Sequence, residues 1–349
     1  MKFDRMTINA LAQGSPLDRL LTANGDTNVL RPYSLNGKGT YVTLNGKAVL
    51  IDNTTASLRK EDWIALDKAL VLIGRKRLSA VGDLNGRGLV YNIPDGMGST
   101  VLQTETQGDA MTAQLSMDGL RRSPNDRPLY ELTNLPLPIM HADFSYSARN
   151  ILASRKSGTP LDTSTMELAV RQVSQKTEQL LLGLESTYTY GGGSIYGYTN
   201  YPSRLTKTIT APSGSAWTGG TLLAELLAAR KQLVDVKMYG PYMLYFAPAW
   251  DQYLDADYVA GYPKTTRARI GEVAGFEGLK TLDYLEDNDI IMIQMTSDVI
   301  RMVNAMPMRT LQWDESGGLQ KNFKVMTIQI PQIRKDQDDN CGLLHASSA

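Results

Sequence analysis

Imidazole and thiol groups, which do much of the acid–base and nucleophilic chemistry near neutral pH, are scarce in this sequence. His141 and His345 are its only histidines, and Cys341 is its only cysteine. One cysteine allows neither an intrachain disulfide nor a thiol cluster that could hold a metal. His141 lies in an alternating segment, 138–144, that predicts a β-strand. We therefore interpret it as a structural residue, with a metal ligand or a general base as the alternative.

A glycine-rich segment, 191–197, has some features of a phosphate-binding loop. Such a loop needs a strand before the glycines, a helix after them and usually a Gly-Lys-Ser/Thr ending. Here the glycines follow a predicted helix, and Lys or Arg is absent between Lys176 and Arg204. We predict a helix stop and a flexible joint. Proteins that bind single-stranded nucleic acid combine aromatic side chains, on which bases stack, with positive charge, and this segment lacks positive charge. We therefore interpret the nearby tyrosines as packing residues: 188, 190, 196, 198 and 201.

Carboxylates cluster twice, at 286–289 and at 336–339. Paired acids can bind Ca²⁺ or transfer protons. The first cluster directly precedes a predicted strand and the second lacks the spacing of a calcium loop, so we predict solvated turns at both places. A Gly-x-Ser-x-Gly nucleophile elbow is also absent. The sequence therefore predicts no catalytic residues, no metal site and no cofactor, and the chain is not expected to be an enzyme.

The composition is that of a globular protein with more than one domain. The chain has 349 residues, of which 42% are hydrophobic and 21% charged, and its 36 basic residues balance its 36 acidic ones. Proteins that hold nucleic acid tightly usually carry a basic excess, so we expect only weak, non-specific contact with DNA. No secretory signal is recognisable, and apolar runs such as 69–73 fall far short of the about 20 residues that cross a membrane. We expect a cytoplasmic protein.

Apolar periodicity predicts three long helices, at 61–73, 165–184 and 221–234. A short helix is expected near Trp250. Ser164 and Glu167 have the spacing of a capping box. Extended segments that alternate or run apolar predict strands at 243–247, 290–295, 299–303, 309–313 and 323–333. This mixture indicates an α+β or α/β architecture with a central sheet.

Two Thr- and Gln-rich segments, 101–115 and 129–144, predict a long β-hairpin joined by a polar turn. A lone hairpin is marginally stable in water, so this one is expected to lie on a partner surface. The candidates for intersubunit ion pairs are at its tip: Arg121, Arg122, Asp126 and Arg127. Residues 1–56 carry many turn signals and predict either an arm that borrows its core from elsewhere or a small hairpin subdomain.

The order of these elements resembles the Hong Kong 97-type capsid fold, in its encapsulin-like branch. That fold is shared by the major capsid proteins of tailed bacteriophages and by encapsulins. The similarity covers about residues 58–346 and is carried by five segments: Glu61 to Leu78 with Asp83-Leu84, Leu137 to Arg149, Ile195 to Pro202, Arg309 to Trp313 and Gly342 to Ala346.

The resemblance implies a major capsid protein that assembles through pentamers and hexamers into an icosahedral shell around double-stranded DNA, in the bacterial host cytoplasm. Its other partners would be scaffolding, portal and decoration proteins, and no membrane is involved. The alternative is an encapsulin shell that encloses cargo enzymes, but the 56 residues before the first predicted helix favour the virus. The implied divisions are an N-terminal arm (1–56), a peripheral helix (57–85), an extended loop (86–146), a peripheral domain with a spine helix (147–214), an axial domain (215–305) and a return to the peripheral domain (306–349).

Two further expectations concern processing of the shell subunit. Some members of this family crosslink through a lysine of the extended loop. Here lysine is absent between Lys76 and Lys156, so we expect non-covalent stabilisation at that loop. Members often lose an N-terminal scaffolding segment by cleavage, and no such cleavage is expected here.

Overall fold

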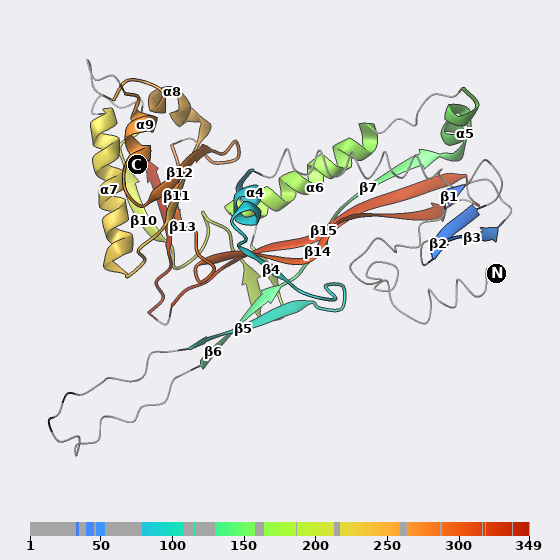
Figure 1. Ribbon diagram of the computed structural model, residues 1–349, viewed down its shortest axis with the longest axis horizontal. Helices are drawn as coiled ribbons and strands as arrows, with labels where there is room; N and C mark the ends of the chain where they lie inside the picture. The colour runs from blue at the N-terminus through green and yellow to red at the C-terminus, as the bar shows by residue number, and fades with distance from the viewer. Residues whose placement is uncertain are drawn as a thin grey trace.

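The computed structural model describes most of the chain beyond residue 78 and three strands before it: residues 33–34, 40–44, 47–52, 79–107, 115, 117, 130–157, 164–185, 187–212, 217–258, 264–286, 288–315, 317, 319–336 and 338–348. The helix expected at 61–73 lies outside these residues, as does most of the arm expected at 1–56. Two hydrophobic cores organise the described part, each built around its own sheet (Figure 1).

The larger core surrounds a five-stranded mixed sheet with the strand order β10-β16-β13-β11-β12. Strand β13 runs antiparallel to its two neighbours, whereas the outer pairs β10–β16 and β11–β12 are parallel. Every residue of β11 and β13 is buried, as continuous apolar runs predict for central strands. The five strands are β10 (Leu205–Ile209), β11 (Tyr242–Phe246), β12 (Phe276–Thr281), β13 (Ile290–Gln294) and β16 (Leu343–Ser348).

Helix α7 (Gly219–Asp235) packs beside this sheet against β10 and β16. It begins with a reciprocal capping box, in which the Thr218 hydroxyl accepts from the Thr221 amide and the Thr221 hydroxyl accepts from the Thr218 amide. The sequence predicted this helix at 221–234, and the structure confirms it. Three short helices complete the lobe: η1 (Pro248–Trp250), α8 (Asp251–Leu254) and α9 (Thr266–Gly271).

The second core lies between a four-stranded sheet, in the order β4-β14-β15-β7, and helix α6 (Ser164–Leu182). The buried residues of α6 recur every three or four positions along the face that packs on β7 and β15, which confirms the helix predicted at 165–184. Its 19 residues make a rod of about 28 Å. The strands are β4 (Val90–Asn92), β7 (Met140–Ser147), β14 (Ile300–Glu315) and β15 (Gln320–Ile333), and α5 (Ala148–Ser157) follows β7.

The prediction of two separate strands at 299–303 and 309–313 is wrong, because both belong to β14. The structure has one strand of 16 residues, paired with β15 across two shifts of register, between Asn304 and Met306 and between Met306 and Arg309. Pro307 lies in the second irregularity, where its missing N–H costs no ladder hydrogen bond. The strand therefore continues past the proline.

The hairpin predicted at 101–115 and 129–144 is present but shorter in the residues described. It consists of β5 (Val101–Gln107) and β6 (Tyr130–Pro136), whereas the chain from Met140 onward leaves it to pair with β15. Pro136 and Pro138 fall at this division, and each lacks the N–H that a strand donates to its neighbour.

A second small hairpin replaces the flexible joint expected at the glycine-rich segment. Gly191 and Gly192 form the turn between β8 (Tyr188–Tyr190) and β9 (Gly193–Ile195), with positive φ of 61° and 75°. Helix α6 ends at Leu182, and the φ of +85° at the following Gly183 suits a helix C-terminus. The remaining elements are α4 (Ser79–Gly86) and a three-stranded sheet of β1 (Tyr33–Ser34), β2 (Thr40–Leu44) and β3 (Lys47–Asp52).

Candidate assembly surface

The β5–β6 hairpin extends away from both cores (Figure 1). Its two strands pair only with each other within the described residues, from Val101 opposite Pro136 to Gln107 opposite Tyr130. Tyr130 and Leu132 are 61% and 62% exposed there. A two-stranded hairpin with exposed large apolar side chains lacks the second layer that stabilises a sheet. The outer part of this hairpin is therefore suited to packing against another surface.

The base of the hairpin, in contrast, is joined firmly to the body. Leu135 and Leu137 are buried in the second core, Leu102 packs against it, and the Leu137 amide donates to the Thr100 carbonyl at 2.9 Å. Apolar burial of this kind contributes about 1.5–3 kcal/mol for a fully buried leucine. The hairpin thus has a fixed root and an unsupported outer part.

A chain of polar side chains connects the root to the long strands. Arg301 Nε of β14 donates to Gln332 Oε1 at 2.6 Å, and Gln332 Nε2 donates to Thr104 Oγ1 at 3.3 Å. The hydroxyls of Thr104 and Thr133 lie 2.8 Å apart across the hairpin. Each link joins a different pair of strands, so the network sets the direction in which the hairpin leaves the body.

The β8–β9 hairpin braces the other side of the root. Asn134 Nδ2 donates to the Gly191 carbonyl at 2.9 Å. A Cβ on Gly193 would stand 1.9 Å from the Asn134 carbonyl oxygen, and one on Gly191 would stand 2.7 Å from Val101 Cγ2. Glycine is needed at 193 because the two backbones approach so closely, and at 191 a positive φ of 61° also favours glycine. The sequence marked this segment by its glycines but gave no sign of what they contact.

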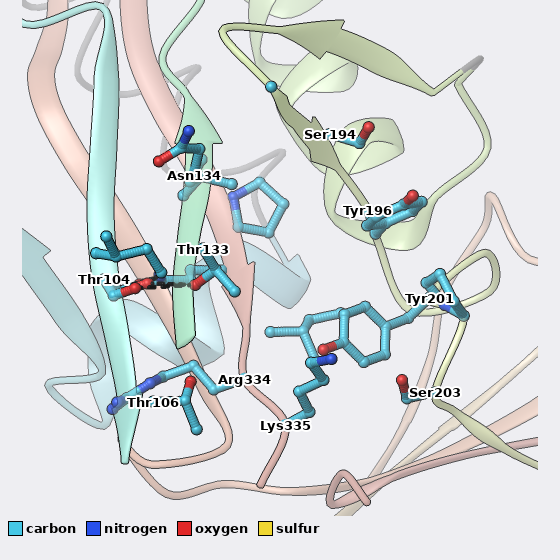
Figure 2. A pocket seen from close by; sticks show the side chains of 17 residues that line it. Thr104, Thr106, Thr133, Asn134, Ser194, Tyr196, Tyr201, Ser203, Arg334 and Lys335 are labelled. Carbon is cyan, nitrogen blue, oxygen red and sulfur yellow. Dashed lines mark hydrogen bonds between the residues drawn. The ribbon is translucent and has the colours of Figure 1, made fainter. Parts of the chain in front are cut away.

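A polar cavity of about 380 Å³ opens between the hairpin root, the segment after β8 and the end of β15. In Figure 2, Thr104, Thr133 and Asn134 line one wall, Ser194, Tyr196 and Tyr201 line the other, and Arg334 and Lys335 approach from just beyond β15. Hydroxyl, amide and cationic groups therefore meet in one place. They come from three distant segments of the chain, so periodicity along the sequence could not have brought them together.

The two arginines near this cavity influence each other. Burial lowers the pKa of the Arg301 guanidinium, and the positive charge of Arg334 lowers it further. Arg301 also lies 4.2 Å from the ring centroid of Tyr91 and donates to Gln332. Lys335 Nζ lies 2.6 Å from Asp339 Oδ1, and that hydrogen bond raises its pKa. Arg334 forms no ion pair with any carboxylate among the described residues.

Helix α4 joins the two cores through buried carboxylates. Glu178 of α6 is 3% exposed and accepts from Ser79 Oγ at 2.6 Å and from the Ala80 amide at 3.3 Å. On α4 itself, the Asp83 carboxylate accepts from Tyr245 Oη at 3.1 Å and from Lys280. The sequence gave no sign of either role, because a glutamate within a polar helix face looks solvated.

Tyr245 and Tyr198 form the aromatic side of that joint. Their rings stack with centroids 6.1 Å apart, and burial raises the pKa of both phenols far above its usual value. Tyr198 and Tyr201 are buried, which confirms the packing role expected for them, whereas Tyr188 and Tyr190 of β8 are exposed. The tyrosine-rich segment therefore divides into a packed part and a surface part.

The remaining sites considered from the sequence are placed as follows. His141 is half exposed on β7, with its Nδ1 3.5 Å from Asp143 Oδ1. Asp336 accepts from the amides of Asp338 and Asn340, which confirms the expected turn. The expectation of a solvated Asp289 is wrong: it is buried, and its Oδ2 lies 3.0 Å from Nε2 of His345 on the neighbouring strand β16.

The proposed contact residues Arg121, Arg122, Asp126 and Arg127 lie outside the described residues. Within those residues, groups of three or more His, Cys, Asp or Glu side chains that could hold a metal ion are not found. Their helices also include none that is long and apolar enough to cross a membrane. Cys341 is buried, and burial raises its pKa to about 11, so its thiol is poorly suited to be a nucleophile.

Comparison with known proteins places this geometry in a family. Residues 53–346 match a family of unknown function (DUF6260). The chain belongs to this family. The chain is also similar to the type 1 encapsulin shell protein EncA of Myxococcus xanthus, with 26% identity over 199 residues. That similarity covers 55% of this chain and 61% of the encapsulin's length.

Solved structures show which fold this DUF6260 member has. A virus-like particle from Pyrococcus furiosus is similar with a TM-score of 0.58 and 16% identity, covering 82% of this chain and all of the other. The capsid of Myoviridae phage XM1 has a TM-score of 0.56 and 10% identity over 75% of this chain and 90% of its own, and Mycobacterium phage Bobi has 0.55 and 10% over 74% and 88%. The chain has the α+β Hong Kong 97-type capsid fold, as the sequence resemblance implied.

Proposed function

We propose that this chain is the major capsid protein of a tailed bacteriophage. Copies of it assemble through pentamers and hexamers into an icosahedral shell that encloses double-stranded DNA. The observation that carries the proposal is the β5–β6 hairpin, which projects from a capsid-type fold with Tyr130 and Leu132 exposed and with no sheet neighbour among the described residues.

Physical arguments connect that hairpin to a closed shell. Obligate interfaces commonly bury about 2,000 Å² or more, and a hairpin lying across a neighbour adds apolar area to such an interface. Each subunit of a closed shell meets several neighbours, so its loss breaks several contacts at once. Modest contacts therefore suffice, and a formal net charge of zero keeps like subunits from repelling one another strongly.

The proposal divides the chain by role. The extended loop comprises 86–146, although β4 and β7 within it pair with β14 and β15. The axial domain around the five-fold and six-fold centres comprises 215–305. The arm (1–56), the peripheral segments (57–85, 147–214 and 306–349) and the candidate contacts Arg121, Arg122, Asp126 and Arg127 complete the scheme. The subunit has a structural role rather than an enzymatic one, assembles in the host cytoplasm, and meets scaffolding, portal or decoration proteins.

Two observations favour different contents for the shell. Capsids of several bacteriophages share the fold, and strands β1 to β3 precede the segment that matches the DUF6260 family, both of which support a virus. The sequence similarity to an encapsulin shell protein supports the second candidate, a nanocompartment around cargo enzymes. We favour the phage capsid and expect its contact with DNA to be weak, because basic and acidic residues balance.

Electron microscopy of the purified chain tests the proposal. We expect closed shells or rings of five and six subunits from the full chain, alone or with the neighbouring phage proteins supplied. The ratio of absorbance at 260 and 280 nm, before and after nuclease treatment, then reports protected nucleic acid. Shells free of nucleic acid that hold a co-purifying enzyme would establish the encapsulin candidate. Particles that stay monomeric at every concentration under all these conditions would contradict both.

A further inference from the structure

The cavity at the hairpin root carries an inference beyond assembly. It encloses about 380 Å³, within the range of small-molecule sites. Its lining includes two cationic side chains, Arg334 and Lys335, and no aspartate or glutamate. Lys335 is engaged by Asp339, so the cation without a counter-charge among the described residues is Arg334. The positive charge of the lining therefore suits an anionic ligand.

The neutral part of the lining strengthens this reading. Hydroxyl groups enter the cavity from both walls, from Thr106 on β5, from Ser194 on β9 and from Ser203 after it. Hydroxyls donate hydrogen bonds to oxyanions, and a planar guanidinium donates two parallel ones. The unpaired Arg334 and the Thr106 hydroxyl lie beside each other at the hairpin wall of the cavity.

A second cavity provides an internal contrast. It encloses about 510 Å³ between β7 and α6 and is lined by Lys176 among mainly apolar residues. There the ammonium of Lys176 lies 2.6 Å from Glu185 Oε2, and both residues line the same cavity. A cation that already has its carboxylate offers little to an anionic ligand. Of the two cavities, the one at the hairpin root has a cation that is unpaired within the described residues, the guanidinium of Arg334.

We propose that this cavity is a binding site for a small free oxyanion of the phosphate or carboxylate class. Arg334 supplies the bidentate contact, and the Thr106 hydroxyl beside it on the hairpin wall supplies a further donor. Because the walls belong to the β5–β6 hairpin on one side and to the body on the other, the bound anion ties the hairpin to the body. This consequence rests on the proposed shell function, whereas the binding itself does not.

Titration calorimetry of the full-length, unassembled chain tests binding, with inorganic phosphate and citrate as probes and chloride at matched ionic strength as the reference. The variant Arg334→Gln is expected to weaken binding of both probes by about tenfold or more, and Arg334→Lys, which keeps the charge but loses the fork, by less. The matched control is Arg149→Gln. It removes the same charge from the exposed surface of α5, away from the cavity, and is expected to bind as the parent does.

A third variant removes the ambiguity of a folding defect. Thr106→Val removes the hydroxyl beside Arg334 without changing any charge and is also expected to weaken binding, with the circular dichroism spectrum unchanged. Failure of the parent chain to bind either probe above the chloride reference would overturn the proposal. Equal binding by the parent and by Arg334→Gln would overturn it as well.

Light scattering during assembly separates this inference from the function on which its consequence rests. Phosphate is expected to change the assembly rate of the parent chain and to leave that of Arg334→Gln unchanged. Binding without assembly under any condition would refute the shell function and leave the anion site standing. Assembly that phosphate does not affect, with no heat of binding, would refute the anion site and leave the shell function standing.

Discussion

The chain contains two long antiparallel hairpins with opposite surroundings. The β14–β15 pair has β4 along one side, β7 along the other and α6 packed over its face. Phe323 of β15 is fully buried, with its ring stacked on Phe144 at 5.1 Å and edge-on to Tyr146 at 5.7 Å. The β5–β6 pair has no sheet neighbour among the described residues and exposes Tyr130 and Leu132. The β14–β15 hairpin is thus buried within the subunit, whereas the β5–β6 hairpin presents an exposed surface that a partner could cover.

The largest effect is expected where the completed hairpin is most buried. Phe323→Ala should lower the free energy of unfolding of the subunit by about 3–5 kcal/mol, because it leaves a cavity between two aromatic rings. Chemical denaturation of the unassembled chain measures this loss. A loss below about 1 kcal/mol would mean that the second core is not packed as described.

A smaller effect is expected where the same hairpin buries a charge. Lys321 is 2% exposed and its Nζ lies 2.5 Å from Asp314 Oδ2, so Asp314→Asn should cost about 1.5–3 kcal/mol. The control is Asp143→Asn, since Asp143 lies 3.4 Å from Lys324, whose side chain is 26% exposed. That exposed pair should be worth about 1 kcal/mol or less. Equal losses for the two variants would show that the burial of Lys321 does not matter.

The brace between the body and the exposed hairpin gives the next effect. Gly193→Ala places a methyl group against the Asn134 carbonyl, and the backbone shift should cost about 1–3 kcal/mol. Gly82→Ala is the matched control, because it meets nothing within 4 Å and lies in helix α4. Denaturation curves of the two variants should therefore separate. If Gly193→Ala is as stable as the parent, the β8–β9 hairpin does not fix the root.

The smallest effect on the subunit is expected on the exposed hairpin. Leu132→Ala should change the unfolding free energy by less than about 0.5 kcal/mol, yet raise the protein concentration that assembly requires. Leu135→Ala, three residues along the same strand, removes a buried side chain and should cost about 2–5 kcal/mol. Sedimentation and denaturation of both variants measure the two properties. If Leu132→Ala assembles normally, this face of the hairpin does not contribute to the interface between subunits.

Elements with strong local patterns could be predicted from the sequence. Helices α6 and α7 follow from apolar residues at helical spacing, and β11, β13 and β15 follow from apolar or alternating runs. Strand β14 was predicted in two pieces because Pro307 interrupts the pattern, and only pairing with β15 carries the strand past it. Local preference thus gave the elements, and tertiary pairing decided their lengths.

The candidate site was much less predictable. The hairpin and its need for a partner followed from its polar composition, but the tip residues chosen as contacts lie outside the described residues. The cavity combines Thr106, Ser194 and Arg334, which are far apart in the sequence and follow no common period. Asp289 was taken for a solvated residue because its partner, His345, comes from another strand. Side-chain partners of this kind are set by the packing of strands and not by their neighbours in the chain.

The position of β16 has a consequence for how the protein is made. In the five-stranded sheet, β10 pairs only with β16, and the residues that pair, such as Leu205 and Leu344, are about 140 positions apart in the chain. During synthesis, the ribosome must therefore deliver residues 343–348 before β10 can join the sheet, whatever has folded earlier. A nascent chain that stops short of these residues keeps an open edge on β13, so this sheet can be completed only after residue 348 has been synthesised.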